Sequence, residues 1–162
     1  MDAKVLIICG SQTDLKFLGG AEGFLKEMAI NYNIRVASAH RTPELVRKIA
    51  KNAEKNGVEV IVAAAGWAAH LPGVIAAYTI LPVIGVPLNT SPLNGIDSVM
   101  SILQMPKGVP VAAVAIGEAG VTNATILAAE ILALKYPPVK KKLINWKKRL
   151  QSSANTSSKN KQ

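Results

Sequence analysis

The stretch that decides the fold is VEVIVAAAGWAAHLPG, residues 58–73. Its first part, Val58–Ala64, is apolar at nearly every position, which predicts a strand buried on both faces. Small residues come next, and a helical pattern begins at about Leu71. A strand, a loop and a helix in this order form the repeating unit of a parallel sheet covered by helices.

The same unit recurs along the chain. Runs rich in Val and Ile predict four further strands, at Val5–Cys9, Ile34–Ala37, Leu81–Val86 and Val109–Ile116. Helical patterns cover residues 18–29, 43–53, 71–78, 96–104 and 119–134. Thr42 is expected to cap the helix that begins at Pro43, and Gly57 to stop it. We therefore predict an α/β fold with three αβα layers and a doubly wound, mostly parallel five-stranded sheet of the flavodoxin-like kind.

The composition is that of a globular protein with one main core. The chain has 162 residues, 49% of them hydrophobic. Its single cysteine, Cys9, excludes an intrachain disulfide and is interpreted as a small buried side chain. No signal peptide is recognisable, so a cytoplasmic location is expected. Between Glu59 and Asp97 no charged side chain occurs, but several prolines interrupt that stretch, and we expect no membrane-spanning helix.

The positive charge is concentrated at one end of the chain. The net charge is +9, yet residues 1–134 hold ten basic and ten acidic side chains, whereas residues 135–162 hold nine basic and none acidic. We divide the chain into an α/β catalytic domain (1–134), a basic amphipathic helix (135–151) and a disordered tail (152–162). The apolar stripe of that helix is expected to pack on the body or on a neighbouring subunit, with membrane or nucleic-acid contact as the alternatives.

Ligands of doubly wound sheets bind beyond the carboxyl ends of the strands. After the first predicted strand comes Gly10-Ser-Gln-Thr-Asp14, where hydroxyls and a helix start suit an anion and Asp14 suits sugar hydroxyls. The alternative is that Ser11, Thr13 or Asp14 only caps the helix. The segment is not a P-loop, because the Lys-Ser/Thr end is missing.

Both histidines also come directly after predicted strands. Ser38-Ala-His-Arg-Thr-Pro43 combines His40, which can transfer a proton near neutral pH, with Arg41, whose guanidinium suits a phosphate. His70 lies in the small-residue segment 65–73, where ligand and backbone can approach closely. The alternatives are a surface His40 with a solvated Arg41, and a hydrogen-bonded core histidine at position 70.

A fourth segment, Asn94–Ser98, leads to Gln104-Met-Pro106, and the alternative here is that Asp97 and Ser98 serve only as helix caps. Two histidines and one cysteine without ligand spacing predict no metal site, and the missing GxGxxG argues against a nicotinamide cofactor. The residues alone thus predict a site for a small phosphorylated molecule, with a histidine that transfers a proton.

Six short motifs occur in this order along the chain: Gly10-Ser-x-Thr-Asp14, Ser38-Ala-His-Arg-Thr-Pro43, Ala68-Ala-His-Leu-Pro-Gly73, Leu93-x-Gly-x-Asp-Ser98, Gln104-Met-Pro-x-Gly-x-Pro-Val-Ala112 and Ala115-Ile-Gly-x-Ala-Gly120. Together they resemble the class I 5-(carboxyamino)imidazole ribonucleotide mutases of purine biosynthesis, also called phosphoribosylaminoimidazole carboxylase catalytic subunits. The resemblance covers about Val5 to Leu134.

The resemblance implies an isomerase, formerly classed as a carboxy-lyase, that needs no metal, ATP or organic cofactor and assembles as a homo-octamer. It implies His40 and His70 as catalytic residues. It implies a substrate-binding set of Ser11, Thr13 and Arg41 for the phosphate, Asp14 for the ribose, Ser38 for the imidazole, and Gly66, Trp67, Ala68 and Leu71 for the pocket that holds transient carbon dioxide. The partners are then a small ribonucleotide and other copies of the chain, with neither nucleic acid nor membrane.

The chain also departs from the family pattern. The family usually has Ser where Thr13 stands and Gly where Trp67 stands, and Thr90, Ala113 and Val121 are milder departures. An indole at position 67 either narrows the pocket or points outward into a subunit contact. The alternative functions are a non-catalytic nucleotide-binding module, a carboxylase that uses carbon dioxide directly, and an interaction protein that works through its basic tail.

Overall fold

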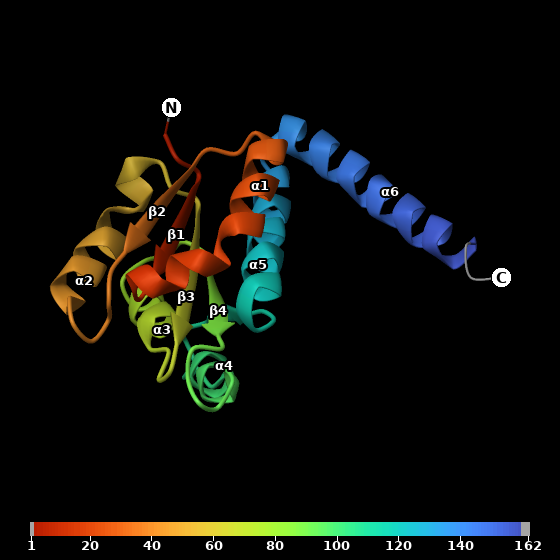
Figure 1. The fold of residues 1–162 in the computed structure, drawn as a ribbon. Helices are drawn as coiled ribbons and strands as arrows, with labels where there is room; N and C mark the ends of the chain where they lie inside the picture. Colours follow the sequence, from red (N-terminus) through yellow and green to blue (C-terminus); the bar gives the residue numbers. More distant parts are fainter. Residues whose placement is uncertain (1, 160–162) are drawn as a thin grey trace.

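The predicted architecture is confirmed by the structure, a computed structural model that describes residues 2–159. Five parallel strands form one sheet in the order β2-β1-β3-β4-β5. Figure 1 shows helices on both faces of this sheet, which makes three layers. The strands are β1 (Val5–Cys9), β2 (Tyr32–Val36), β3 (Val60–Gly66), β4 (Val83–Leu88) and β5 (Ala112–Ala113).

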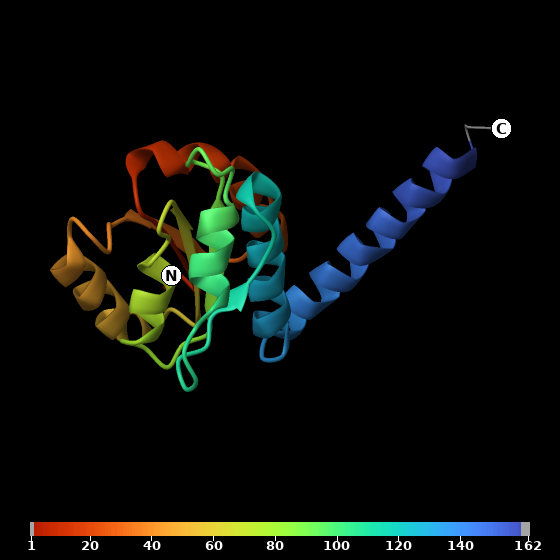
Figure 2. The same ribbon diagram turned by 90° about the horizontal axis from the view of Figure 1, so that it is seen from below.

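Alternate side chains of the central strands enter two separate cores, because successive residues of a strand point to opposite faces. One core lies under α1 (Gly19–Met28) and α5 (Gly117–Ala133) and takes, for example, Ile7 and Val62. The other takes Ile8 and Ile61 and lies under the helices of the opposite face. These helices are α2 (Pro43–Asn52), α3 (Leu71–Ala76) and α4 (Ile96–Leu103), as Figures 1 and 2 show.

The two edge strands differ most from prediction. The strand predicted over Val109–Ile116 is reduced to Ala112–Ala113 and pairs only with β4. Pro110 has no N–H to donate to a ladder, and an edge strand has a single neighbour, so little pairing survives there. The strand predicted at Ile34–Ala37 is Tyr32–Val36, and its alternately exposed side chains are those of an edge strand.

Helix boundaries also differ from prediction. The pattern over residues 18–29 forms α1, preceded by a separate 3₁₀ helix, η1 (Gln12–Phe17). Thr42 is the N-cap residue of α2, as predicted, but its hydroxyl makes no capping bond and donates to the Ser38 carbonyl at 3.1 Å instead. Gly57 does not end α2 but the short η2 (Glu54–Asn56) after it, where its φ of +82° suits glycine.

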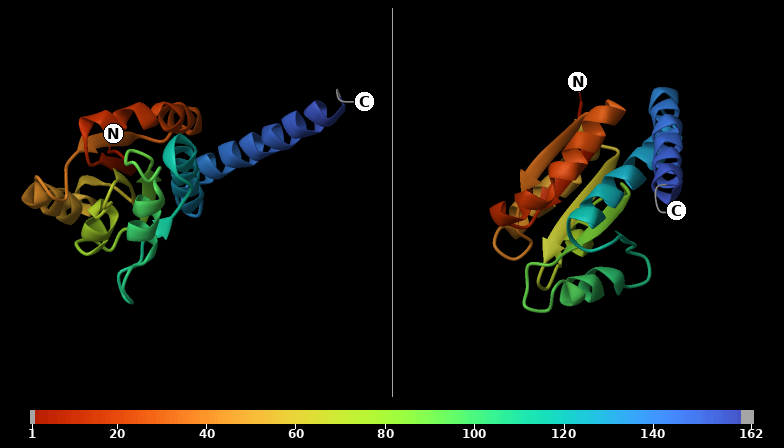
Figure 3. Two further views of the ribbon diagram at one scale, coloured as in Figure 1. Left: turned by 60° about the horizontal axis from the view of Figure 1, so that its bottom comes forward. Right: turned by 45° about the vertical axis from the view of Figure 1, so that its right-hand side comes forward.

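The basic C-terminal segment forms one long helix, α6 (Pro137–Lys159), which projects from the body in Figures 1 and 3. Its first half packs on the layer of α1 and α5: Leu143 is buried, and the Trp146 ring meets Phe24 edge-on at 5.2 Å. The helix continues past residue 151, where disorder was predicted, because no Gly or Pro interrupts residues 152–159. Residues 160–162 lie outside the described part of the chain.

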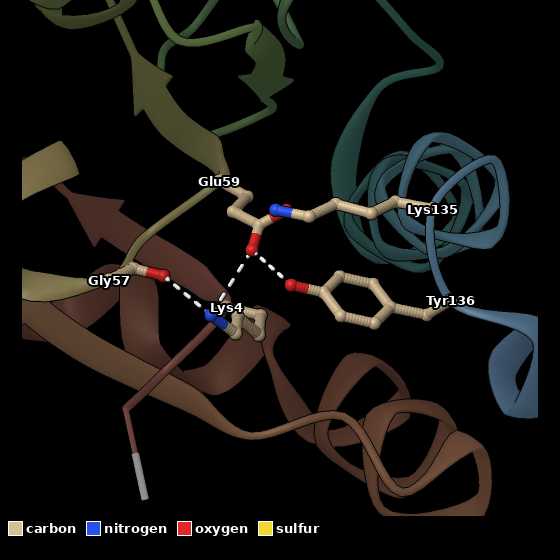
Figure 4. A network of polar contacts seen from close by, with 5 residues as sticks. All are labelled: Lys4, Gly57, Glu59, Lys135 and Tyr136. Atoms are coloured by element: carbon tan, nitrogen blue, oxygen red, sulfur yellow. Dashed lines mark hydrogen bonds and ion pairs between the residues drawn. The ribbon is translucent and has the colours of Figure 1, made fainter.

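An ion network ties this end of the chain to the sheet, at the end opposite the carboxyl ends of the strands (Figure 4). Glu59, just before β3, accepts a hydrogen bond from Tyr136 and pairs with Lys4 at 3.1 Å and Lys135 at 3.2 Å. Burial would raise the pKa of the Glu59 carboxyl, but hydrogen bonds from Tyr136, Lys4 and Lys135 outweigh burial and hold this pKa below its ordinary value.

The lowered pKa of Glu59 predicts that the stability of the folded protein decreases at acidic pH. A carboxyl whose folded pKa is depressed stabilises the protein above its unfolded pKa, and this contribution is lost as the pH falls through the folded pKa. We expect Glu59→Gln to lower the free energy of unfolding by about 1–2 kcal/mol at pH 7 and by much less near pH 3. Urea unfolding at both pH values measures this, with Glu54→Gln on exposed η2 as the control. Equal losses at the two pH values would contradict the prediction.

Candidate active site

The loops after β1, β2 and β3 meet at one edge of the sheet and surround a cavity of about 490 Å³. β2 and β3 lie on opposite sides of β1, so the strand order reverses there. The cavity lies at this switch point, where doubly wound sheets bind their ligands. All of the predicted site residues line it: Ser11, Thr13, Asp14, Ser38, His40, Arg41, Gly66, Trp67, Ala68, His70 and Leu71. Their roles toward a ligand stay predictions.

The loop after β1 concentrates groups suited to an anion. Ser11 Oγ lies 2.9 Å from Thr13 Oγ1 and accepts a hydrogen bond from the Thr13 N–H, so Ser11 does cap η1. The Arg41 guanidinium reaches the same turn and donates to the Gly10 carbonyl at 3.2 Å. Two hydroxyls and a fixed cation therefore share one end of the cavity, where a phosphate could be bound.

Beneath this loop the environment is apolar. Asp14 is 5% exposed, and burial raises the pKa of its carboxyl, although backbone amides of Ser11 and Gly10 and the charges of Arg41 and Lys16 act the other way. Burial, with a smaller contribution from Asp14, raises the pKa of the Cys9 thiol to about 12. Cys9 is fully buried and stays a neutral thiol, as its interpretation as a small buried side chain requires.

His40 and His70, thirty residues apart in the chain, form a direct pair. The distance from His40 Nε2 to His70 Nδ1 is 2.7 Å, and the rings meet edge-on with centroids 4.8 Å apart. One nitrogen must donate and the other accept, so the pair cannot carry a proton on both facing nitrogens and keep this bond.

Hydrogen bonds within the loop after β2 hold His40 in place. The Ser38 N–H donates to Thr42 Oγ1 at 2.9 Å, and Ser38 Oγ accepts from the Arg41 N–H at 3.2 Å. These bonds close the turn that carries His40 and Arg41, so the proton-transfer group and the cation are positioned together.

The loop after β3 is supported from below by two residues that the sequence did not reveal as such. Ser98 is fully buried and lies within hydrogen-bonding distance of the Trp67 carbonyl, at 3.1 Å, and of the Leu88 carbonyl, at 3.2 Å. A Cβ on Gly66 would lie 1.8 Å from Thr90 Oγ1, so only glycine fits there. The alternative that Ser98 serves only as a helix cap does not hold, because Gly95 is the N-cap residue of α4 and no side chain caps this helix.

Thr90 also lines the cavity and lies outside the predicted site segments. Four further lining residues belong to those segments but had no role assigned to them individually: Gly10, Ala39, Ala65 and Ala69. The place of Thr90 after β4 was the available signal, because the other site loops also come after strands.

Asp97 Oδ1 is buried with no hydrogen-bond partner in the part of the chain that the structure describes. Within residues 2–159 no three His, Cys, Asp or Glu side chains form a potential metal site.

The fold and the cavity define a doubly wound α/β protein with a small-ligand site at the switch point of its sheet. A family model described as "AIR carboxylase" matches residues 4–153, and the chain belongs to this family.

Relatives and solved structures agree with this family. The N5-carboxyaminoimidazole ribonucleotide mutase of Thermotoga maritima is 55% identical over 91% of this chain and 85% of its own length. The Escherichia coli protein of the same name is 46% identical, over 90% and 86% respectively. A crystal structure of Treponema denticola PurE2-S38D superposes with a TM-score of 0.87 at 27% identity and covers all of both chains.

The Trp67 backbone predicts an unusual substitution effect. Trp67 has a φ of +55°, a left-handed conformation that a Cβ disfavours, and 60% of its surface is exposed. Trp67→Gly and Trp67→Ala both remove the indole, but only Ala keeps the Cβ. We expect the Gly variant to be more stable than the Ala variant by about 1 kcal/mol, measured by urea unfolding. Equal stability would show that no backbone strain resides at this position.

Proposed function

We propose that this protein is a 5-(carboxyamino)imidazole ribonucleotide mutase of de novo purine biosynthesis. It would convert its substrate into 4-carboxy-5-aminoimidazole ribonucleotide. The observation that carries the proposal is the His40–His70 pair in a cavity whose other end holds Ser11, Thr13 and Arg41. The relatives that bear the mutase name are 46–55% identical to this chain, which supports the same activity here.

The arrangement of the cavity suggests one orientation for the nucleotide. The phosphate would bind Ser11, Thr13 and Arg41, with Asp14 accepting hydrogen bonds from the ribose. The heterocycle would then reach Ser38 and the two histidines. The small residues Gly66 and Ala68, with Leu71, would enclose the carbon dioxide that forms during the reaction.

The chemistry needs a group that first gives and then takes one proton. His40, as an imidazolium, protonates the carbamate nitrogen while the bond from that nitrogen to the carboxylate carbon breaks and carbon dioxide leaves. The ring carbon of the aminoimidazole then attacks the trapped carbon dioxide and forms a carbon–carbon bond. Neutral His40 removes the proton from that ring carbon, which restores aromaticity and regenerates the imidazolium.

The His70 hydrogen bond suits this cycle, because it fixes the orientation of the His40 ring and gives the ring a partner in either protonation state. Enclosure of carbon dioxide beside the ring carbon turns the recarboxylation into a reaction between neighbours. The reaction balances without metal or organic cofactor, since one proton and one carboxyl group change places on the same molecule.

The assembly and the location are parts of the same proposal. We expect a homo-oligomer, an octamer, in the cytoplasm, and light scattering would then give about eight times the 17.1 kDa chain mass. No helix among the described residues is both long and apolar enough to cross a membrane.

Direct carboxylation is the second candidate, favoured by the "AIR carboxylase" description of the family model. One assay separates the candidates. The purified protein receives carboxyaminoimidazole ribonucleotide in one tube, and aminoimidazole ribonucleotide with bicarbonate in another. Rapid turnover in the first tube alone supports the mutase, and rapid turnover in the second alone supports the carboxylase. Binding without turnover in either would leave a nucleotide-binding module.

The role of His40 predicts the effect of a substitution. Asparagine is smaller and cannot transfer a proton, so His40→Asn should lower kcat by roughly 10²–10⁴-fold while aminoimidazole ribonucleotide still binds. His70→Asn should retain more activity, because it removes the partner that orients the His40 ring but keeps the group that transfers the proton. Steady-state kinetics between pH 5 and 9 measure both. A His40→Asn enzyme with normal kcat would exclude this role.

A further inference from the structure

Trp67 lies at the cavity in a conformation that this chain holds against local preference. Its φ of +55° is in the region that favours glycine. Disfavoured backbone conformations of bulky residues persist only where the surrounding structure enforces them, and they concentrate at functional sites. The indole is therefore a feature of this chain that needs its own explanation.

The residues around Trp67 enforce this conformation. The Ser98 hydroxyl contacts the Trp67 carbonyl oxygen at 3.1 Å, and Ser98 itself is fully buried. On the other side, Gly66 packs so closely on Thr90 that no Cβ would fit. These contacts restrict the loop backbone on both sides of the Trp67 Cα, at a position that lines the cavity.

The rest of this wall consists of small residues. Gly66, Ala68 and Ala69 line the cavity beside Trp67, and the His40–His70 pair lies within the same cavity. Trp67 keeps 60% of its surface exposed, so most of its aromatic surface makes no contact with the rest of this chain. A planar heterocycle bound near the histidines would offer a surface on which such a ring can stack.

We propose that Trp67 is a specificity-determining residue whose indole stacks on the heterocycle of the bound nucleotide and closes the cavity over the carbon dioxide released there. The inference rests on the proposed function and deepens it. Trp67 transfers no proton; it positions the ring and keeps carbon dioxide beside the ring carbon until the carbon–carbon bond forms. A ligand with the sugar and the phosphate but without the imidazole heterocycle would gain no binding energy from this contact.

The first test uses fluorescence. The chain has two tryptophans, and Trp146→Phe leaves Trp67 as the only one. Position 146 packs on Phe24 at α6, away from the cavity, and Phe retains an aromatic contact there. Aminoimidazole ribonucleotide should change the Trp67 emission on binding, whereas ribose 5-phosphate should bind without a comparable change. Calorimetric binding of the nucleotide with unchanged emission would overturn the proposal, as would equal changes with both probes.

The second test measures how often carbon dioxide escapes. With carboxyaminoimidazole ribonucleotide as substrate, each turnover ends either in the carboxylated product or in free aminoimidazole ribonucleotide. Trp67→Gly should weaken nucleotide binding by roughly three- to tenfold and raise the escaping fraction several-fold, while Trp67→Phe, which keeps an aromatic ring, should stay near the unsubstituted protein. An escaping fraction and affinity unchanged in Trp67→Gly would instead assign the indole to contact with another copy of the chain.

The two proposals can fail separately. If the unsubstituted protein turns over neither substrate of the two-tube assay, the proposed function fails, whatever position 67 contains. If it turns over the mutase substrate and Trp67→Gly matches it in affinity and in escaping fraction, the function stands and only the role of Trp67 is lost.

Discussion

The parallel pairing of β1 between β2 and β3 is the constraint on which the site depends. β1 aligns Val36 and Ala64 on either side of Cys9; β2 ends at this level and β3 only two residues beyond it, so the loops after the three strands start close together. These loops carry the anion-binding groups and both histidines. The 2.7 Å contact between His40 and His70 is a consequence of this register, and a slip of one strand would separate the rings.

The apolar floor of the cavity sets its electrostatics. β1 and β3 are buried almost throughout, and the same burial that raises the pKa values of Cys9 and Asp14 keeps water from approaching the site from below. β1 and β3 carry no basic side chain, so the positive charge at the cavity comes from its loops, chiefly from Arg41. Stability at the opposite end of the sheet depends on a different set of charges, the network around Glu59, so the two ends can vary independently.

The loops around the cavity lie within the family match, whereas the backbone conformation of Trp67 depends on contacts within this chain. The matched family and relatives account for the loops that surround the cavity. The left-handed backbone of Trp67 is explained by its surroundings in this chain, the contact with Ser98 and the close packing of Gly66 on Thr90. The family match extends to residue 153 and so includes most of the basic α6, whose docking through Leu143 and Trp146 reflects an amphipathic pattern.

The sequence alone determined the α/β alternation, the central strands and the site loops. Continuous apolar runs predict buried parallel strands, and the polar or small residues directly after each run predict its loop. Short-range patterns could not predict the His40–His70 contact or the support of Trp67 by Ser98, since each depends on residues far apart in the chain. Only the tertiary structure decided these, because strand register and layer packing set the distances between loops.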